Sequence, residues 1–318
     1  MKDLRTQIGE TKEICSRELQ KYPLAQIGEN LGQTDAATGD SVSIVRSLSR
    51  SHDRKADLGR LAGKIGAEEG IASASLQRAL LLGAALVSLE RLDKLPVDPS
   101  VKELICQEFQ FFAKPSSHEM SLFAPERYSF SALCKIAVLE RFPAGQFHWE
   151  ISGFPRSWLF KVSPAALPRV VYFLCVDLGG FAPCFFPHMA TRRKNPLMLL
   201  EKESDKSWFR MASSARLWPG IRGLVASSWL HSPDTFEASP HLSFINKPFV
   251  ESGALVTTMG KADESAGYLA GSSQRRDLYK SGKFKPTLGL VLWSREQMME
   301  WAYAHPEFRA EIEVRVRG

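Results

Sequence analysis

The sequence predicts an α/β (or α+β) protein in which an N-terminal helical region precedes a mixed-sheet α/β domain with flanking helices. Through the first half of the 318-residue chain, apolar residues recur at helical spacing. Near Pro143 the pattern changes to short apolar runs separated by Gly and Pro. Strands that alternate with helices beyond this point are typical of a mixed α/β sheet. We therefore expect a helical domain over residues 1–142 and a mixed α/β domain over residues 143–318, which could also form one fused unit.

The composition is that of a globular protein, with 44% hydrophobic and 24% charged residues. A net charge of +6 and a pI of about 9.0 favour an anionic ligand or nucleic acid without requiring either. The five cysteines form no C-x-x-C motif, so a zinc ribbon or a redox dithiol has no support. The N-terminus lacks a hydrophobic signal core, and no apolar run is long enough to span a bilayer. The expectation is a cytoplasmic protein without a membrane partner.

Five helices are expected in the first half, each with an apolar stripe that would face the core. They cover residues 1–24, 43–64, 71–92, 101–112 and 130–141. The most continuous apolar run lies in residues 71–92, so this helix should be central to a bundle. The strong helices contain no Glu-x-x-His pair of the kind that holds a di-metal centre, so the stripes are interpreted as core.

Short strands and helices alternate in the second half. Strands are expected at residues 147–151, 170–176, 184–190, 223–230, 254–259 and 288–293, and helices at residues 204–217, from Ser239-Pro240 onward, 272–281 and 295–304. The second and third strands are joined by a Gly-Gly turn, which suggests a hairpin or a tight corner. Pro168 is expected to stop a helix that Ser163-Pro164 begins. The tail EIEVRVR alternates strictly, which suggests an edge strand or an ordered arm.

The first polar group is His148 with Glu150, two residues apart in one predicted strand and therefore on the same sheet face. Such a couple can act as a general base with an orienting carboxylate, or as two ligands of a metal. The same spacing is also typical of an ordinary polar strand face. His148 and Glu150 are therefore candidate catalytic residues.

The second group is His188 followed by Arg192, Arg193 and Lys194. It combines a strand end, a basic loop and the start of a helix, for which Asn195-Pro196 supplies the signals. Backbone N–H groups at a helix start attract phosphate, and arginine adds bidentate contacts. The three basic residues are candidates for binding the anionic part of a cofactor, with a solvated basic loop as the alternative.

Two further candidates follow along the chain. Arg275 and Arg276, next to an aromatic residue and several lysines, could contact the phosphates of a nucleotide or RNA, or could form a charged helix face. His231 follows a predicted strand, where catalytic residues of α/β proteins collect, and Ser232 and Asp234 lie beside it. His231 is the third candidate for a catalytic base.

The order of elements over residues 170–293 resembles the core of the acyl-CoA N-acyltransferase superfamily: two neighbouring strands, a basic loop, a helix, a strand and a helix. The resemblance implies a splayed sheet, an acyl or aminoacyl donor, and transfer to an amine or hydroxyl. It also implies that the loop TRRKN binds the pyrophosphate of the donor. The glycines of that family's loop signature are not present in TRRKNP.

These observations leave three hypotheses for the function. The first is an acyl- or aminoacyl-transferase that acts on a small amine or hydroxyl acceptor with a phosphate-bearing donor, either acyl-CoA or aminoacyl-tRNA. The second is a metal-dependent enzyme with His148, Glu150 and His188 as ligands, and the third is a non-enzymatic or nucleic-acid-binding module. The sequence contains no G-x-G-x-x-G, Walker A, G-x-S-x-G or H-E-x-x-H motif, which argues against the enzyme classes that these motifs define.

Overall fold

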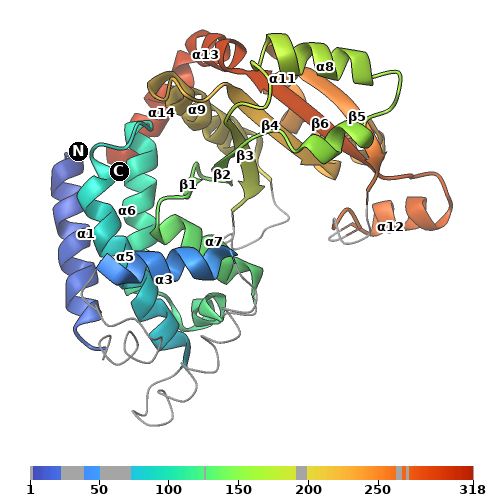
Figure 1. Cartoon of the computed structure of the whole chain (residues 1–318). Helices are drawn as coiled ribbons and strands as arrows, with labels where there is room; N and C mark the ends of the chain where they lie inside the picture. Colours follow the sequence, from blue (N-terminus) through green and yellow to red (C-terminus); the bar gives the residue numbers. More distant parts are fainter. Residues whose placement is uncertain are drawn as a thin grey trace. The chain divides into compact units, whose positions relative to one another are not determined.

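The computed structural model describes residues 3–22, 39–50, 73–124, 127–190, 199–262, 267–269 and 272–317. It confirms the mixed α/β class, because N-terminal helices precede a six-stranded mixed sheet with interspersed helices (Figure 1). The strand order is β1-β2-β3-β4-β6-β5. The chain divides into two compact units: unit 1 comprises Met1–Leu95 and Pro99–Pro143, and unit 2 comprises Pro96–Asp98 and Ala144–Gly318.

Unit 1 is predominantly helical. It contains α1 (Leu4–Leu19), α3 (Gly39–Arg50), α5 (Ser73–Leu92), α6 (Pro99–Ala113), the 3-10 helix η1 (Ser117–Phe123), α7 (Tyr128–Ala137) and the short strand β1 (Arg141–Pro143). The helices expected at residues 1–24, 71–92, 101–112 and 130–141 are confirmed with shifted ends. Of the helix expected at 43–64, residues 51–64 lie outside the described residues.

Aromatic side chains fill part of the core of unit 1. Phe109, Phe112 and Phe123 are completely buried, and the rings of Phe111 and Phe123 stack at 5.6 Å between centroids. Burial of side chains this large is a main source of stability for a small helical unit. The apolar stripes of these helices are therefore core, as the sequence predicts. None of the helices among the described residues is long and apolar enough to cross a membrane.

Unit 2 contributes five strands to the sheet. They are β2 (Phe147–Ser152), β3 (Cys184–Met189), β4 (Gly223–Ser228), β5 (Leu255–Lys261) and β6 (Thr287–Ser294). β3 and β4 are parallel and share a single register pair, Phe185 with Leu224. The pairs β2/β3, β4/β6 and β5/β6 are antiparallel. The strands expected at 147–151, 184–190, 223–230, 254–259 and 288–293 are confirmed within a few residues.

Helices connect and flank these strands. They are η2 (Arg156–Phe160), α8 (Leu167–Val176), α9 (Glu201–Leu217), η3 (Trp229–His231), α10 (Pro233–Ala238), η4 (Pro240–Asn246), α11 (Lys247–Glu251), α12 (Ser273–Lys280), α13 (Arg295–Ala304) and α14 (Pro306–Arg317). The helices expected at 204–217, 272–281 and 295–304 are confirmed, and the helix expected from Ser239-Pro240 is divided between η4 and α11.

The strand predicted at residues 170–176 is wrong, because this segment is helix α8. Pro168 was expected to stop a helix that begins at Ser163-Pro164. It lies instead in the first turn of α8, where the missing N–H costs nothing, so it helps to begin this helix. Val170, Phe173 and Leu174 are buried and follow the helical i, i+3, i+4 spacing. The predicted hairpin between residues 170–176 and 184–190 is therefore also wrong.

The edge strand or arm predicted for residues 311–317 is wrong as well, because these residues belong to helix α14. Pro306 occupies the first position of this helix, and Glu307 lies in its first turn. Glutamate and arginine are good helix formers, and here their propensity outweighs the two-residue alternation of the tail.

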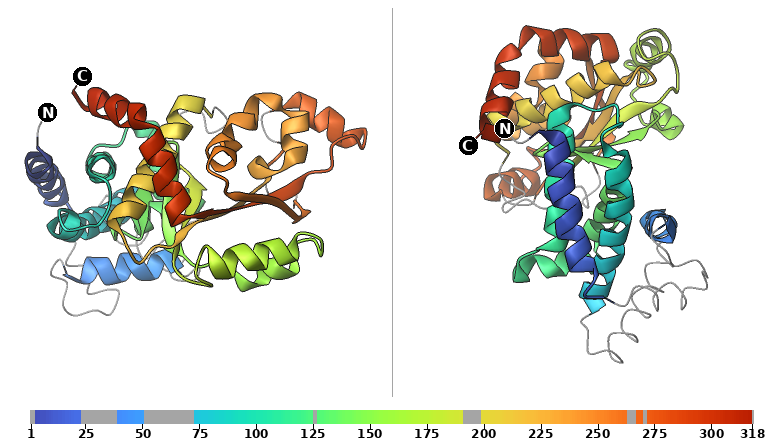
Figure 2. Two further views of the ribbon diagram at one scale, coloured as in Figure 1. Left: turned by 90° about the horizontal axis from the view of Figure 1, so that it is seen from above. Right: turned by 90° about the vertical axis from the view of Figure 1, so that its left-hand side faces the viewer.

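Helix α8 covers one face of the sheet in unit 2. Its buried residues Val170, Phe173 and Leu174 belong to the same apolar cluster as Leu290 and Leu292 of β6. Figure 2 shows α8 in light green on one side of these strands, with the orange helices of residues 233–251 on the other. We call the side covered by α8 the α8 face.

Helices α9 and α11 cover the opposite face through a series of aromatic contacts. Phe147 of β2 stacks on Trp208 of α9 with 4.4 Å between ring centroids. Phe249 of α11 then contacts both Trp208, at 5.0 Å, and Trp293 of β6, at 5.1 Å. Because neighbouring residues of a strand point to opposite faces, Phe147 on this face places His148 on the α8 face.

Candidate active site

β2 and β3 place three titratable side chains on the α8 face of the sheet. In the antiparallel register, His148 lies opposite His188, and Glu150 lies opposite Phe186. Residues two apart in a strand share a face, and so do residues paired across strands. His148, Glu150 and His188 are therefore gathered on one face, although forty residues of sequence separate the two histidines.

The closest pair in this group is His188 with Glu150. His188 Nε2 lies 3.3 Å from Glu150 Oε1, and the two side chains are 22% and 17% exposed. They form an ion pair when the imidazole is protonated. A carboxylate at this distance stabilises the imidazolium that forms when the ring accepts a proton from a substrate. His148 is buried next to them in the register. This arrangement is suited to general acid–base chemistry.

Aromatic rings border the histidine. The ring of Phe186 lies 5.3 Å from the imidazole of His188, and Trp158 of η2 lies 5.7 Å from Phe186. Apolar neighbours of this kind reduce the access of water and strengthen the interaction between His188 and Glu150. Sequence reasoning missed both aromatic residues, although the position of Phe186 two residues before His188 was a usable signal.

The group is not arranged as a metal site. Among the residues that the structure describes, no set of three or more His, Cys, Asp or Glu side chains has a geometry that could hold a metal ion. His148, Glu150 and His188 thus share a face without forming a ligand set.

His231 lies elsewhere, in η3 after β4. Its ring packs against Phe249, with 5.6 Å between centroids, on the face opposite to His148. It is buried, and its Nδ1 lies 2.8 Å from Asn246 Oδ1, while Asn246 Nδ2 donates to the carbonyl of His231. Burial lowers the pKa of His231 to about 4, and the bond to Asn246 opposes this only in part. The structure does not bring this histidine together with Glu150.

Ser232 and Asp234, next to His231, tie their turn to β6. Thr287 donates from Oγ1 to Asp234 Oδ2 at 2.7 Å, and its Oγ1 lies 2.6 Å from Ser232 Oγ. Gly289 of β6 lies so close to this turn that an added Cβ would come within 2.2 Å of the carbonyl carbon of His231. These contacts fix the path of the chain after β4.

The basic residues Arg192, Arg193 and Lys194 lie outside the described residues. The described part of this segment ends at Ala190, two residues beyond His188. The chain therefore enters the basic segment directly from the strand end that carries the candidate base.

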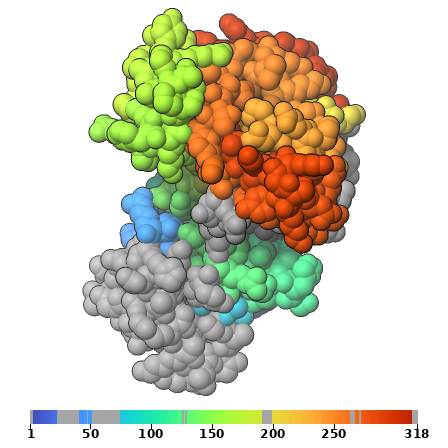
Figure 3. Space-filling model, turned by 90° about the vertical axis from the view of Figure 1, so that its right-hand side faces the viewer, coloured from blue at the N-terminus to red at the C-terminus, as the bar shows by residue number. Residues whose placement is uncertain are grey.

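Arg275 and Arg276 lie in α12, whose surface is visible in Figure 3. Arg275 is buried: its Nε donates to the carbonyl of Tyr268 at 2.6 Å, and its guanidinium lies 5.0 Å from the ring centre of Trp229. Burial lowers the pKa of Arg275. Arg276 is exposed, and its Nη1 donates to the carbonyl of Leu269 at 3.4 Å. Arg275 thus lies in a buried environment and donates hydrogen bonds to other residues of the protein, whereas the side chain of Arg276 is exposed to solvent.

Comparisons with known proteins give no match: no family model, no curated protein and no solved structure matches this chain.

Proposed function

We propose that unit 2 is an acyl- or aminoacyl-transferase that acts on a small amine or hydroxyl acceptor with a phosphate-bearing donor. The observation that carries the proposal is the 3.3 Å approach of His188 Nε2 to Glu150 Oε1, between partly exposed side chains. A histidine next to a carboxylate is a common general base. His188 also lies near the end of β3, just before the basic segment that contains Arg192 and Arg193.

In the proposed reaction, His188 removes a proton from the acceptor amine or hydroxyl through Nδ1, because its Nε2 is buried and faces Glu150. The acceptor nitrogen or oxygen then attacks the acyl carbon of the donor, and a new C–N or C–O bond forms. The donor's C–S bond in a CoA thioester, or its C–O ester bond in aminoacyl-tRNA, breaks, and the proton passes from His188 to the leaving sulfur or oxygen. Glu150 stabilises the imidazolium between these two proton transfers.

The donor would be held by the connection between β3 and α9. Its three consecutive cations, Arg192, Arg193 and Lys194, suit a pyrophosphate or an RNA backbone, since guanidinium groups bind phosphate oxygens in a bidentate manner. The resemblance to the acyl-CoA N-acyltransferases includes a strand at residues 170–176, which is helix α8, so the donor site is argued from the basic segment itself. A CoA thioester or an aminoacyl-tRNA in the cytoplasm is the corresponding donor.

The proposal is tested by offering the full chain a panel of CoA thioesters with primary amines and alcohols, and a parallel panel of aminoacyl-tRNAs. Release of the CoA thiol or of deacylated tRNA measures transfer. His188→Ala should lower kcat by about 10²- to 10⁴-fold, the range for loss of a general base. His241→Ala, at an exposed position in η4, is the matched control and should be fully active.

A His188→Ala protein that is folded and retains the wild-type rate would contradict the proposed role of the base. The donor site is tested separately with Arg192→Ala combined with Arg193→Ala. The double substitution should weaken donor binding, because it removes two of the three cations. Unchanged affinity for both CoA esters and tRNA would exclude this segment as the donor site.

A further inference from the structure

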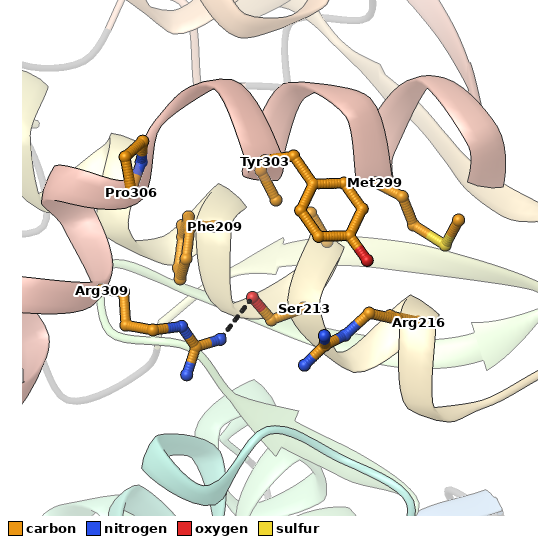
Figure 4. Close-up of a pocket in the computed structure, with 9 residues that line it drawn as sticks. Phe209, Ser213, Arg216, Met299, Tyr303, Pro306 and Arg309 are labelled. Atoms are coloured by element: carbon orange, nitrogen blue, oxygen red, sulfur yellow. Dashed lines mark hydrogen bonds between the residues drawn. The ribbon is translucent and has the colours of Figure 1, made fainter.

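A second candidate site lies within unit 2, between α9, α13 and α14 (Figure 4). It is a cavity of about 150 Å³. We propose that this cavity binds a small monocarboxylate that carries an apolar group about the size of a six-membered ring. The proposal is independent of the transferase activity, since it concerns different residues on a different surface.

The cavity is separated from His188 by the sheet. On α9, Trp208 stacks against Phe147 of β2 on the face opposite to the α8 face, as described above. The next residue, Phe209, lines the cavity together with residues of α13 and α14. α9 thus faces the sheet on one side and the cavity on the other, so a ligand here would not reach the imidazole of His188.

The inner part of the cavity is apolar. Phe209 of α9, Met299 and Ala302 of α13 and Pro306 of α14 contribute to its lining. An apolar cavity of about 150 Å³ in another protein is known to accept benzene, so this volume suits one six-membered ring or a short branched chain. Burial of such a group supplies the hydrophobic part of the binding free energy.

The polar side of the cavity is cationic. Figure 4 shows the guanidinium groups of Arg216 and Arg309 at the same side of the cavity, and the hydroxyl of Tyr303 points toward Arg216. Arg309 Nη2 donates to Ser213 Oγ at 3.4 Å. In the described part of the chain, the Arg216 guanidinium has neither an ion pair nor a hydrogen bond. A carboxylate can accept charge-assisted hydrogen bonds from both guanidinium groups and a further hydrogen bond from the phenol.

The charge around the cavity favours a monoanion. Arg309 Nη2 also lies 3.3 Å from Asp98 Oδ2, so this guanidinium shares its charge with a carboxylate that is itself 7% exposed. Two guanidiniums and one carboxylate leave a net charge of +1. A single carboxylate from a ligand neutralises that charge, whereas a phosphate dianion would leave an excess negative charge close to Asp98.

The experiment uses the full chain, with benzoate as the probe and isothermal titration calorimetry as the measurement. Benzoate should bind saturably at one site. Benzyl alcohol, which has the same ring without the charge, should bind at least about tenfold more weakly than benzoate, because it loses the charge-assisted hydrogen bonds. Phenyl phosphate should also bind more weakly than benzoate.

Two results would overturn the proposal: the absence of saturable benzoate binding, or equal affinities for benzoate and benzyl alcohol. Tighter binding of phenyl phosphate than of benzoate would overturn the preference for a monoanion.

Two variants locate the binding. Arg216→Gln should weaken benzoate binding about tenfold while the fold is unaffected, since the side chain is exposed. Ala302→Phe should fill the cavity and abolish binding. Arg276→Gln, at an exposed position in α12, is the matched control and should bind benzoate normally. Benzoate affinity that is unchanged in Arg216→Gln would overturn the assignment.

Transfer at His188 and benzoate binding in the cavity should be lost separately. His188→Ala should lose transfer and keep its affinity for benzoate, whereas Arg216→Gln should lose affinity for benzoate and keep transfer. Loss of benzoate binding in a folded His188→Ala protein would contradict the independence of the cavity.

Discussion

Two histidines of unit 2 illustrate how similar sequence contexts lead to different roles. His188 and His231 each occur at or just after the end of a strand, and each has a polar side chain next to its ring. The partner of His188 is the carboxylate of Glu150, and both side chains are partly exposed. The partner of His231 is the neutral amide of Asn246, and both residues are buried.

The difference determines what each ring can do. A buried imidazole with a neutral partner stays uncharged, as the lowered pKa of His231 indicates, and serves to hold its turn in place. A partly exposed imidazole beside a carboxylate can exchange a proton with a substrate and is stabilised after it has done so. We therefore assign a structural role to His231 and propose a chemical one for His188.

The largest expected effect on stability comes from adding a side chain to Gly289, which lies close to the backbone of His231 and Ser232. In Gly289→Ala, the new Cβ would lie 2.2 Å from the carbonyl carbon of His231 and 2.6 Å from the amide nitrogen of Ser232. Both are backbone atoms, so β6 and the turn must move apart, which should cost about 3 kcal/mol or more of unfolding free energy. Urea denaturation measures this, with Gly220→Ala as a control, because a Cβ there meets nothing within 4 Å. Equal stability of the two variants would contradict the described packing.

The second prediction concerns pH. The pKa of His231 falls from 6.5 to about 4 on burial, so between these values the unfolded chain binds more protons than the folded protein. The contribution of His231 to the free energy of unfolding is therefore fully present above pH 6.5 and is lost as the pH falls toward 4. The loss is roughly 3 kcal/mol at most. Unfolding free energy measured across this range should show the loss.

A background variant is needed for this measurement, because Asp205 acts in the opposite direction. Burial, followed by the nearby Glu201, raises the pKa of Asp205 to about 6, so its contribution decreases as the pH rises through this range. In Asp205→Asn, the decrease in unfolding free energy at low pH should reflect His231 without the opposing contribution of Asp205. Adding His231→Gln should remove most of it, whereas adding His241→Gln should leave it intact. An acid response that persists without His231 would disprove the assignment.

A smaller difference in stability is expected between variants of the neighbouring residues Arg275 and Arg276. Arg275→Ala should destabilise unit 2 by about 2 kcal/mol, since it removes two buried hydrogen bonds and a contact with Trp229. Arg276→Ala, at an exposed neighbour, should change stability by less than about 0.5 kcal/mol. Thermal unfolding of both variants checks this. Equal stability of Arg275→Ala and Arg276→Ala would contradict the predicted contribution of the buried hydrogen bonds of Arg275 to the stability of unit 2.

Much of the fold follows from the sequence, and the failures have physical reasons. The helix α13 and the strands β2 and β6 were predictable, because their periodicity and flanking residues agree. α8 was mistaken for a strand, since seven apolar and β-branched residues cannot be assigned by periodicity alone. The tail was mistaken because its two-residue alternation conflicts with its helix propensity.

The candidate site was predictable only in part. The spacing of His148 and Glu150 places them on one face from the sequence alone. That His188 lies within reach of Glu150 depends on the register of β2 against β3, which no local pattern specifies. The cavity between α9, α13 and α14 could not be predicted, since it depends on how three helices pack.

A double-mutant cycle shows whether His188 and Glu150 act as one catalytic unit. The quantity is kcat/KM for His188→Ala, Glu150→Gln and the double variant, on the donor and acceptor that the panel identifies. If Glu150 acts through His188, the double variant should be no slower than His188→Ala alone. A double variant whose loss equals the product of the two single losses would show that the residues act independently and would contradict the account.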